Sequence, residues 1–332
     1  MSSVVDTTLD EGSTAVREVV VRTEPFEIGT PRGTLRGRWQ HVPGRARPAG
    51  TVVVAPPFGV QMRKGAAIAL YFLLNGYDVV RYDPTNHVGI ADGDIADLTP
   101  SGLAEDLRLV VEWATANSRG PSVCLFSTSI STRLTFAMLA GAEISPTAVG
   151  AISAVVDMAA TIEIAAGQDL IRQWTSGRET DPNVARDVLD HEIKMTFVKD
   201  LVERGWDTTA SVEADLAAMG PVPLLTVQGA KDDWVDVEEA KRVFGATARG
   251  SVVVLSDAVH ALNPASARTA MTEIIRFFNQ HCGADAGDAV TVPQFPQIVA
   301  QSKSESRLDG AAPAAEVTHL VPVPPQARPE NP

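Results

Sequence analysis

The feature that most constrains this fold is an alternation, between residues 51 and 282, of short apolar runs with stretches of helical spacing. The apolar runs are rich in β-branched residues and lack polar alternation, which is typical of strands buried on both faces of a sheet. We expect these strands at residues 51–57, 78–83, 121–127, 148–156, 222–229 and 251–257. The expected helices cover residues 62–74, 98–116, 132–140, 237–244 and 265–279. Because alternating strands and helices form βαβ units, the pattern predicts an α/β fold with a mostly parallel, doubly wound sheet.

The segments outside this alternation divide the chain. Residues 157–220 are helical in character and have the place and size of a cap inserted above the strand ends. Residues 1–16 are polar and acidic, and eight of the chain's 22 prolines fall in its last 50 residues. Such compositions are typical of disordered segments. The predicted organisation is a disordered leader at 1–16, an α/β core at 17–156 and 221–282, a helical cap insertion at 157–220 and a disordered Pro-rich tail at 283–332. An antiparallel strand pair is expected at the start of the core, before residue 42.

The composition argues against several classes of function. The formal net charge of the 332 residues is −13, which repels nucleic-acid phosphates. The two cysteines, Cys124 and Cys282, come with no CxxC motif or Cys/His cluster, so neither a disulfide framework nor a metal site is indicated. No apolar run has the length of about 18 residues that a membrane span needs, and the polar start does not resemble a secretory signal. We therefore expect a cytoplasmic protein with no metal, no cofactor, no nucleic-acid partner and no membrane span.

A candidate nucleophile lies where a predicted strand meets the following helix, in the sequence Ser127-Thr128-Ser129-Ile130-Ser131. A nucleophile elbow is a sharp strand-to-helix turn that exposes a serine hydroxyl at the carboxyl edge of a sheet, and small residues must flank that serine. Here serines replace the usual glycines on both sides. A serine-rich helix start is also typical of a plain N-cap, so the motif alone leaves both interpretations open.

Two later strand-end loops carry residues that complete this chemistry. Asp232 follows the strand 222–229, and His260 follows the next strand, just before a helix. The order Ser, Asp, His in successive strand-end loops is that of the α/β-hydrolase fold, so we predict Ser129, Asp232 and His260 as a catalytic triad. In that triad His260 takes the proton of Ser129, and Asp232 fixes the tautomer of the imidazole. The alternative acids are Asp233, Asp236 and Asp157.

The oxyanion of a tetrahedral intermediate needs two backbone N–H donors. Ile130 follows the nucleophile directly and supplies the first. Phe58 supplies the second, because the two residues before it in the loop are prolines without an N–H group. The loop after the strand 78–83 contains His87, which we interpret as a hydrogen-bonded scaffold residue, with part of a docking surface as the alternative.

At these residues the sequence resembles a known family, the acyl-carrier-protein thioesterase or fatty acyl transferase of the bacterial bioluminescence fatty-acid reductase complex. The stretches that carry the resemblance are residues 75–95 (NGYDVVRYDPTNHVGIADGDI), 127–133 (STSISTR), 197–211 (FVKDLVERGWDTTAS) and 232–235 (DDWV). The serine-flanked elbow and the GWD sequence are not general features of α/β hydrolases, which makes the resemblance specific. The resemblance implies that Ser129, Asp232 and His260 match the family's nucleophile, acid and base.

The resemblance also implies the reaction. An acyl group passes from a thioester of an acyl-carrier protein or of CoA to the serine, and then to water or to an acceptor enzyme. Because carrier proteins are acidic, docking one on this acidic chain requires a locally basic patch. A small-molecule carboxylesterase on the same fold and a non-catalytic scaffold are the alternative functions. The large apolar cap residues sited to line an acyl tunnel are Leu170, Trp174, Met195, Phe197 and Trp206.

Overall fold

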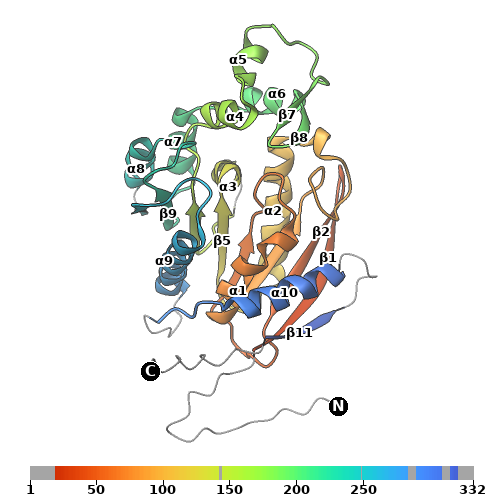
Figure 1. Cartoon of the computed structure of the whole chain (residues 1–332), viewed down its shortest axis with the longest axis vertical. Coiled ribbons are helices and arrows are strands. Elements are labelled where there is room, and N and C mark those ends of the chain that lie inside the picture. The colour runs from red at the N-terminus through yellow and green to blue at the C-terminus, as the bar shows by residue number, and fades with distance from the viewer. Residues whose placement is uncertain (1–18, 142–143, 248, 283–288, 309–314, 321–332) are drawn as a thin grey trace, which may run out of the picture.

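A sheet of nine strands forms the centre of the molecule (Figure 1). The computed structural model describes residues 19–141, 144–247, 249–282, 289–308 and 315–320. The order of strands across the sheet is β10-β9-β6-β5-β3-β4-β2-β1-β11. The strands are β1 Val19–Thr30, β2 Gly33–His41, β3 Thr51–Val54, β4 Asp78–Asp83, β5 Val123–Thr128, β6 Ala148–Ile152, β9 Leu224–Gly229, β10 Gly250–Leu255 and β11 Glu316–Leu320.

The six strands from β10 to β4 are parallel, which confirms the predicted doubly wound arrangement. Every residue of β3, β4, β6 and β9 is buried, including the polar residues of β4 and β9, as expected for strands covered on both faces. The pair β1 and β2 is antiparallel, as expected, and extends the sheet beyond β4.

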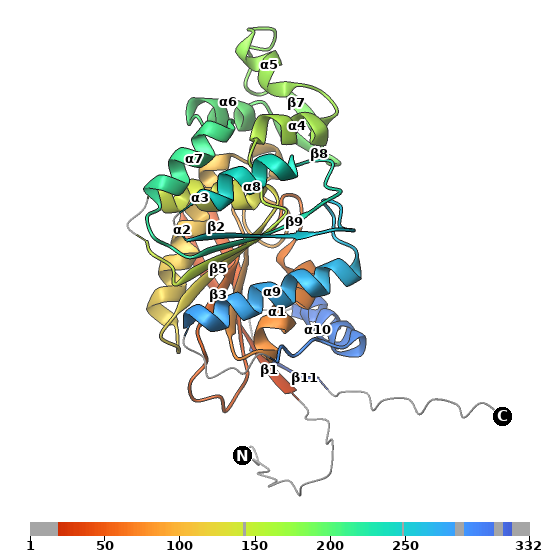
Figure 2. The same cartoon turned by 90° about the vertical axis from the view of Figure 1, so that its left-hand side faces the viewer.

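Helices cover both faces of the sheet and lie where their spacing predicts them. Helices α2, α3 and α8 pack with one hydrophobic core, whereas α1 and α9 pack with the core on the opposite face (Figure 2). Their bounds are α1 Ala66–Leu74, α2 Pro100–Asn117, α3 Ile130–Gly141, α8 Val237–Gly245 and α9 Pro264–Cys282, and the short helix η1 (Met62–Gly65) precedes α1. Asn263 is the N-cap of α9, because its side chain accepts hydrogen bonds from two N–H groups of the first turn.

The segment 157–220 forms a separate layer at one end of the sheet (Figure 1). Its helices are α4 Met158–Ala166, α5 Leu170–Thr175, α6 Thr196–Glu203 and α7 Thr209–Ala218. It also contains a hairpin of β7 (Ala185–Val188) and β8 (His191–Lys194), which the prediction of a purely helical cap missed. The turn residues Leu189 and Asp190 both have positive φ, and leucine gives no sequence signal for such a turn.

The prediction of a disordered tail over residues 283–332 is wrong for two segments of it. Helix α10 (Phe295–Leu308) packs against α1, and β11 pairs antiparallel with β1 at the edge of the sheet. Glu305 of α10 is fully buried, where its carboxylate accepts hydrogen bonds from Arg81 at 2.5 Å and from Gln40 at 3.2 Å. Composition missed this segment because buried polar partners from distant strands hold it in place. The predicted leader lies outside the described residues.

None of the helices in the described part of the chain combines the length and the hydropathy of a membrane span.

Candidate active site

Ser129 lies at a strained turn between β5 and α3. Its φ is 52°, a left-handed conformation that a non-glycine residue adopts at a cost of about 1–2 kcal/mol. The backbone N–H of Ser129 donates to the carbonyl of Ile152 at 3.0 Å, and its carbonyl accepts from the amide of Thr132 at 2.9 Å. The turn therefore projects the Ser129 hydroxyl from the carboxyl end of β5, which is the geometry of a nucleophile elbow.

The structure brings Ser129, His260 and Asp232 into one hydrogen-bonded row. The Ser129 Oγ lies 2.8 Å from Nε2 of His260. The other ring nitrogen, Nδ1, lies 3.0 Å and 3.1 Å from the two carboxylate oxygens of Asp232. The Asp232 side chain is fully buried, and its Oδ1 also accepts from the amides of Trp234 and Val235. A serine, an imidazole and a buried carboxylate in this order are equipped for nucleophilic acyl transfer.

The alternative acids are exposed to solvent or accept hydrogen bonds at the start of a helix. Asp233 is exposed. The carboxylate of Asp236 accepts from two amides at the start of α8, and that of Asp157 accepts from an amide at the start of α4. Both are therefore helix N-caps.

Two residues that the sequence did not single out hold the imidazole in place. The indole of Trp234 stacks on the His260 ring with centroids 4.8 Å apart and an interplanar angle of 14°. The Ser153 hydroxyl donates to the carbonyl of His260 at 2.9 Å, which ties the histidine loop to the end of β6. The DDWV stretch thus provides both the carboxylate and the ring that covers the imidazole.

The loop after β3 carries Phe58, the second predicted oxyanion donor. Ser131, two residues after the nucleophile, donates its hydroxyl to the carbonyl of Pro56, so the elbow and this loop are tied together. The backbone amide of Gly59, the residue after Phe58, donates to Nε2 of His87 at 3.1 Å. Gly59 has a φ of 67°, and a Cβ there would lie 2.6 Å from His191 of the cap. The loop is therefore held from two sides, and the positive φ of Gly59 favours glycine at this position.

His87 has the hydrogen bonds of a neutral imidazole. Its Nδ1 lies 3.2 Å from the carbonyl of Val88, to which it donates when Nε2 accepts from Gly59. Burial lowers the pKa of His87 to about 4, the Val88 carbonyl opposes this shift, and His191 adds to it. The prediction of a hydrogen-bonded scaffold residue was correct, but its partner, the predicted oxyanion loop, could not be read from the sequence.

Arg133 links the elbow helix to the cap. Its fully buried guanidinium donates to the carbonyl of Trp206 at 3.0 Å, to Ser211 at 3.1 Å and to Asp215 at 2.5 Å. It also lies 5.9 Å from the centre of the Trp206 ring. Burial lowers the pKa of Arg133, and Asp215 opposes that shift. The last residue of the STSISTR stretch and the GWD sequence of the cap therefore form one contact.

The predicted acyl-binding residues occupy different places. Leu170, Met195 and Phe197 line an apolar space beneath the cap, together with the side chains of Phe58 and Ile130. We call this space the cap cavity, and its volume is about 10 Å³. Trp206 does not line it, because its ring packs against Arg133 and Arg204. Trp174 does not line it either and packs, half-buried, at the edge of the core.

Comparison with known proteins agrees with this architecture. A family model described as acyl transferase matches residues 38–262. The acyl transferase of Vibrio campbellii is 31% identical over 205 residues, which cover 60% of this chain and 64% of the relative. The chain thus spans less than two thirds of that relative's length. Est1E of Butyrivibrio proteoclasticus, solved with ferulic acid bound, has a TM-score of 0.62 at 18% identity, covering 78% of this chain and 99% of its own. The α/β hydrolase GrgF from Penicillium has a TM-score of 0.59 at 16% identity, covering 79% and 99%. These likenesses confirm the α/β-hydrolase fold.

Proposed function

Because the chain belongs to the acyl transferase family, we propose that it moves acyl groups through a covalent ester on Ser129. His260 accepts the proton of the Ser129 hydroxyl while Oγ attacks the carbonyl carbon of a thioester. Asp232 holds the imidazole in the tautomer with a proton on Nδ1 and stabilises the imidazolium that forms. The backbone amides of Phe58 and Ile130 donate to the oxyanion.

The remaining steps complete the acylation of Ser129 and then release the acyl group. The tetrahedral intermediate collapses, the carbon–sulfur bond breaks, and His260 returns its proton to the departing thiolate. A water molecule or an acceptor then loses a proton to His260 and attacks the carbonyl carbon of the Ser129 ester. As the bond from that carbon to Oγ breaks, His260 returns the proton to Oγ, which releases the acyl group and restores the serine.

The observation that carries this proposal is the 2.8 Å contact between the Ser129 hydroxyl and a histidine whose other nitrogen faces a buried carboxylate. We propose as donors the thioesters of an acyl-carrier protein or of CoA, with water or an acceptor enzyme receiving the acyl group. The Vibrio campbellii relative, an acyl transferase, supports an acyl group as what is transferred.

The test is to trap the acyl-enzyme. After incubation with an acyl thioester and an acid quench, mass spectrometry should find the acyl group on the peptide that contains Ser129. Ser129→Ala should remove the adduct and lower turnover by about 10⁴–10⁶, the range expected when a triad serine is removed. Ser127→Ala is the matched control, because the Ser127 hydroxyl is buried and has no hydrogen-bond partner among the described residues. An adduct that persists in Ser129→Ala would show that Ser129 is not the nucleophile.

A further inference from the structure

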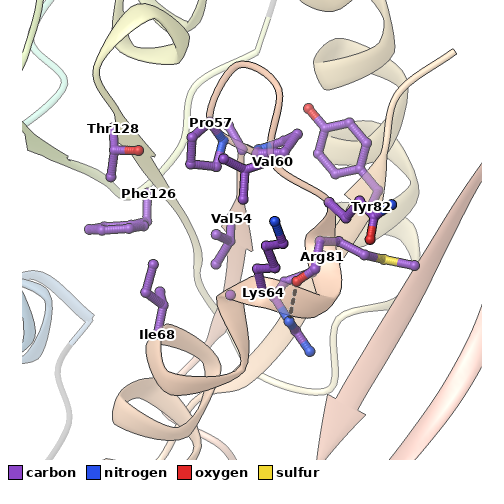
Figure 3. Close-up of a pocket in the computed structure, with 14 residues that line it drawn as sticks. Val54, Pro57, Val60, Lys64, Ile68, Arg81, Tyr82, Phe126 and Thr128 are labelled. Carbon is purple, nitrogen blue, oxygen red and sulfur yellow. Dashed lines mark hydrogen bonds between the residues drawn. The ribbon is translucent and has the colours of Figure 1, made fainter. Parts of the chain in front are cut away.

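A second apolar space adjoins the oxyanion loop, on the side of the sheet that α1 covers (Figure 3). Its walls come from the ends of β3, β4 and β5, from the loop after β3, and from η1 and α1. We call it the back pocket. Its volume is about 210 Å³, against about 10 Å³ for the cap cavity.

The back pocket lies beside the reaction centre. Thr128, which lines it, immediately precedes Ser129 in the chain. Pro56 and Pro57, which also line it, immediately precede Phe58, the proposed oxyanion donor. Since consecutive Cα atoms are about 3.8 Å apart, the backbone of Ser129 lies directly beside the wall of this pocket.

The lining of the pocket is mostly apolar, and Gln61, Lys64 and Thr128 are polar residues that also belong to it; of these, Lys64 is exposed to solvent. Val54, Ile68 and Phe126 point into it in Figure 3. Arg81 also lies in the wall, but its guanidinium donates to Gln40, to Glu305 and to the carbonyl of Met62. Its charge is therefore compensated from behind the wall, and an apolar ligand would not have to displace its hydrogen bonds.

The two volumes decide which space can hold a chain. A cavity needs roughly 10–15 Å³ to hold one water molecule, so the cap cavity has no room for a methylene chain. An engineered apolar cavity of about 150 Å³ in another protein binds benzene, with six carbons. At the same volume per carbon atom, the back pocket holds roughly eight carbons. We propose that the back pocket receives the acyl chain and selects chains of about eight carbons, an inference that rests on the acyl transfer through Ser129 proposed above.

The test is a chain-length profile with acyl p-nitrophenyl esters of about two to fourteen carbons. In the wild-type protein, kcat/KM should rise by about fourfold per methylene, the equivalent of about 0.8 kcal/mol, and should stop rising near eight carbons. Ile68→Trp fills the back pocket and should lower the ratio of octanoyl to acetyl kcat/KM by at least about thirtyfold, the contribution of two to three methylenes.

A matched pair of substitutions separates the two spaces. Ile68→Ala and Leu170→Ala each remove three carbons, the first from the back pocket and the second from the cap cavity. Ile68→Ala should move the optimum towards longer chains, whereas Leu170→Ala should keep the wild-type optimum. Circular dichroism and thermal melting check that each variant is folded.

The outcomes are distinguishable. A shift in Leu170→Ala with none in the Ile68 variants would overturn the proposal in favour of the cap cavity. Unchanged profiles in all three variants would overturn it as well, since neither space would then select the chain. If no ester, acetyl included, were turned over in a Ser129-dependent way, the proposed function itself would fail.

Discussion

The cap cavity and the back pocket adjoin the same loop after β3, and both have apolar walls, but only the back pocket is open. The cap cavity is closed because Leu170, Met195 and Phe197 pack against Phe58 and Ile130 and leave about 10 Å³. The back pocket has about 210 Å³, and its walls come from strand ends, the loop after β3, η1 and α1. Large apolar residues near a proposed nucleophile therefore indicate packing as readily as binding, and the free volume distinguishes the two.

The cap is fastened by polar contacts as well as by this packing. Besides the contacts of Arg133, the amide and hydroxyl of Ser101 at the start of α2 donate to Asp200 of α6 at 2.7 Å and 2.9 Å. These contacts tie the cap to α2 and to α3, the helix that follows Ser129. We expect the cap to exclude water from the proposed acyl-enzyme.

The largest expected effect concerns the proposed catalytic acid, which acts in the reaction whichever space holds the acyl chain. Asp232→Asn should lower kcat by about 10³–10⁴, because an asparagine favours the wrong tautomer of His260. The loss should be equal for acetyl and octanoyl esters, since Asp232 contacts neither space. Asp233→Asn is the control, because that residue is exposed, and it should retain most activity. Steady-state kinetics would contradict the assignment if the larger loss came from Asp233→Asn.

The next effect concerns the wall behind the back pocket. Glu305→Ala should lower the free energy of unfolding by about 3–5 kcal/mol, because it removes the carboxylate that pairs with the buried guanidinium group of Arg81. Glu273→Ala removes a surface pair with Arg276 and should cost no more than about 1 kcal/mol. Urea denaturation would measure both. Equal losses would mean that α10 does not support this wall.

The smallest effect concerns the loop that adjoins both spaces. The pKa of His87 is lowered to about 4 in the folded protein by burial and by His191, whereas an unfolded histidine titrates near 6.5. Below about pH 6.5, His87 therefore gains a proton in the unfolded chain but not in the folded protein. As the pH is lowered from 6.5 to about 4, the free energy of unfolding should decrease by up to about 3 kcal/mol. Above pH 6.5 this contribution is constant.

The matched variant is His87→Gln, which cannot titrate. Urea denaturation of both proteins between about pH 4 and pH 7 should show a smaller loss of stability in the variant, by up to about 3 kcal/mol. Identical pH dependence would mean that His87 is not held neutral beside Gly59.

The sequence predicted the elements that follow from local pattern. Parallel strands bring their carboxyl ends to one edge, so Ser129, Asp232 and His260 could be placed together from their order alone. The features it missed depend on contacts between distant segments. Glu305 is buried against Arg81, 224 residues away in the chain. The back pocket is formed by several elements that are separated in the sequence, and no local pattern shows that they enclose a common space.

The most direct measurement is a crystal structure of the protein after Ser129 has reacted with a fluorophosphonate that carries an octyl chain, the length of about eight carbons that the back pocket should hold. The phosphonyl group marks the position of the reacting carbonyl, and the chain shows where the acyl group lies. We predict that the chain enters the back pocket and contacts Ile68 and Phe126. A chain that lies beneath the cap, against Leu170 and Met195, would contradict this account.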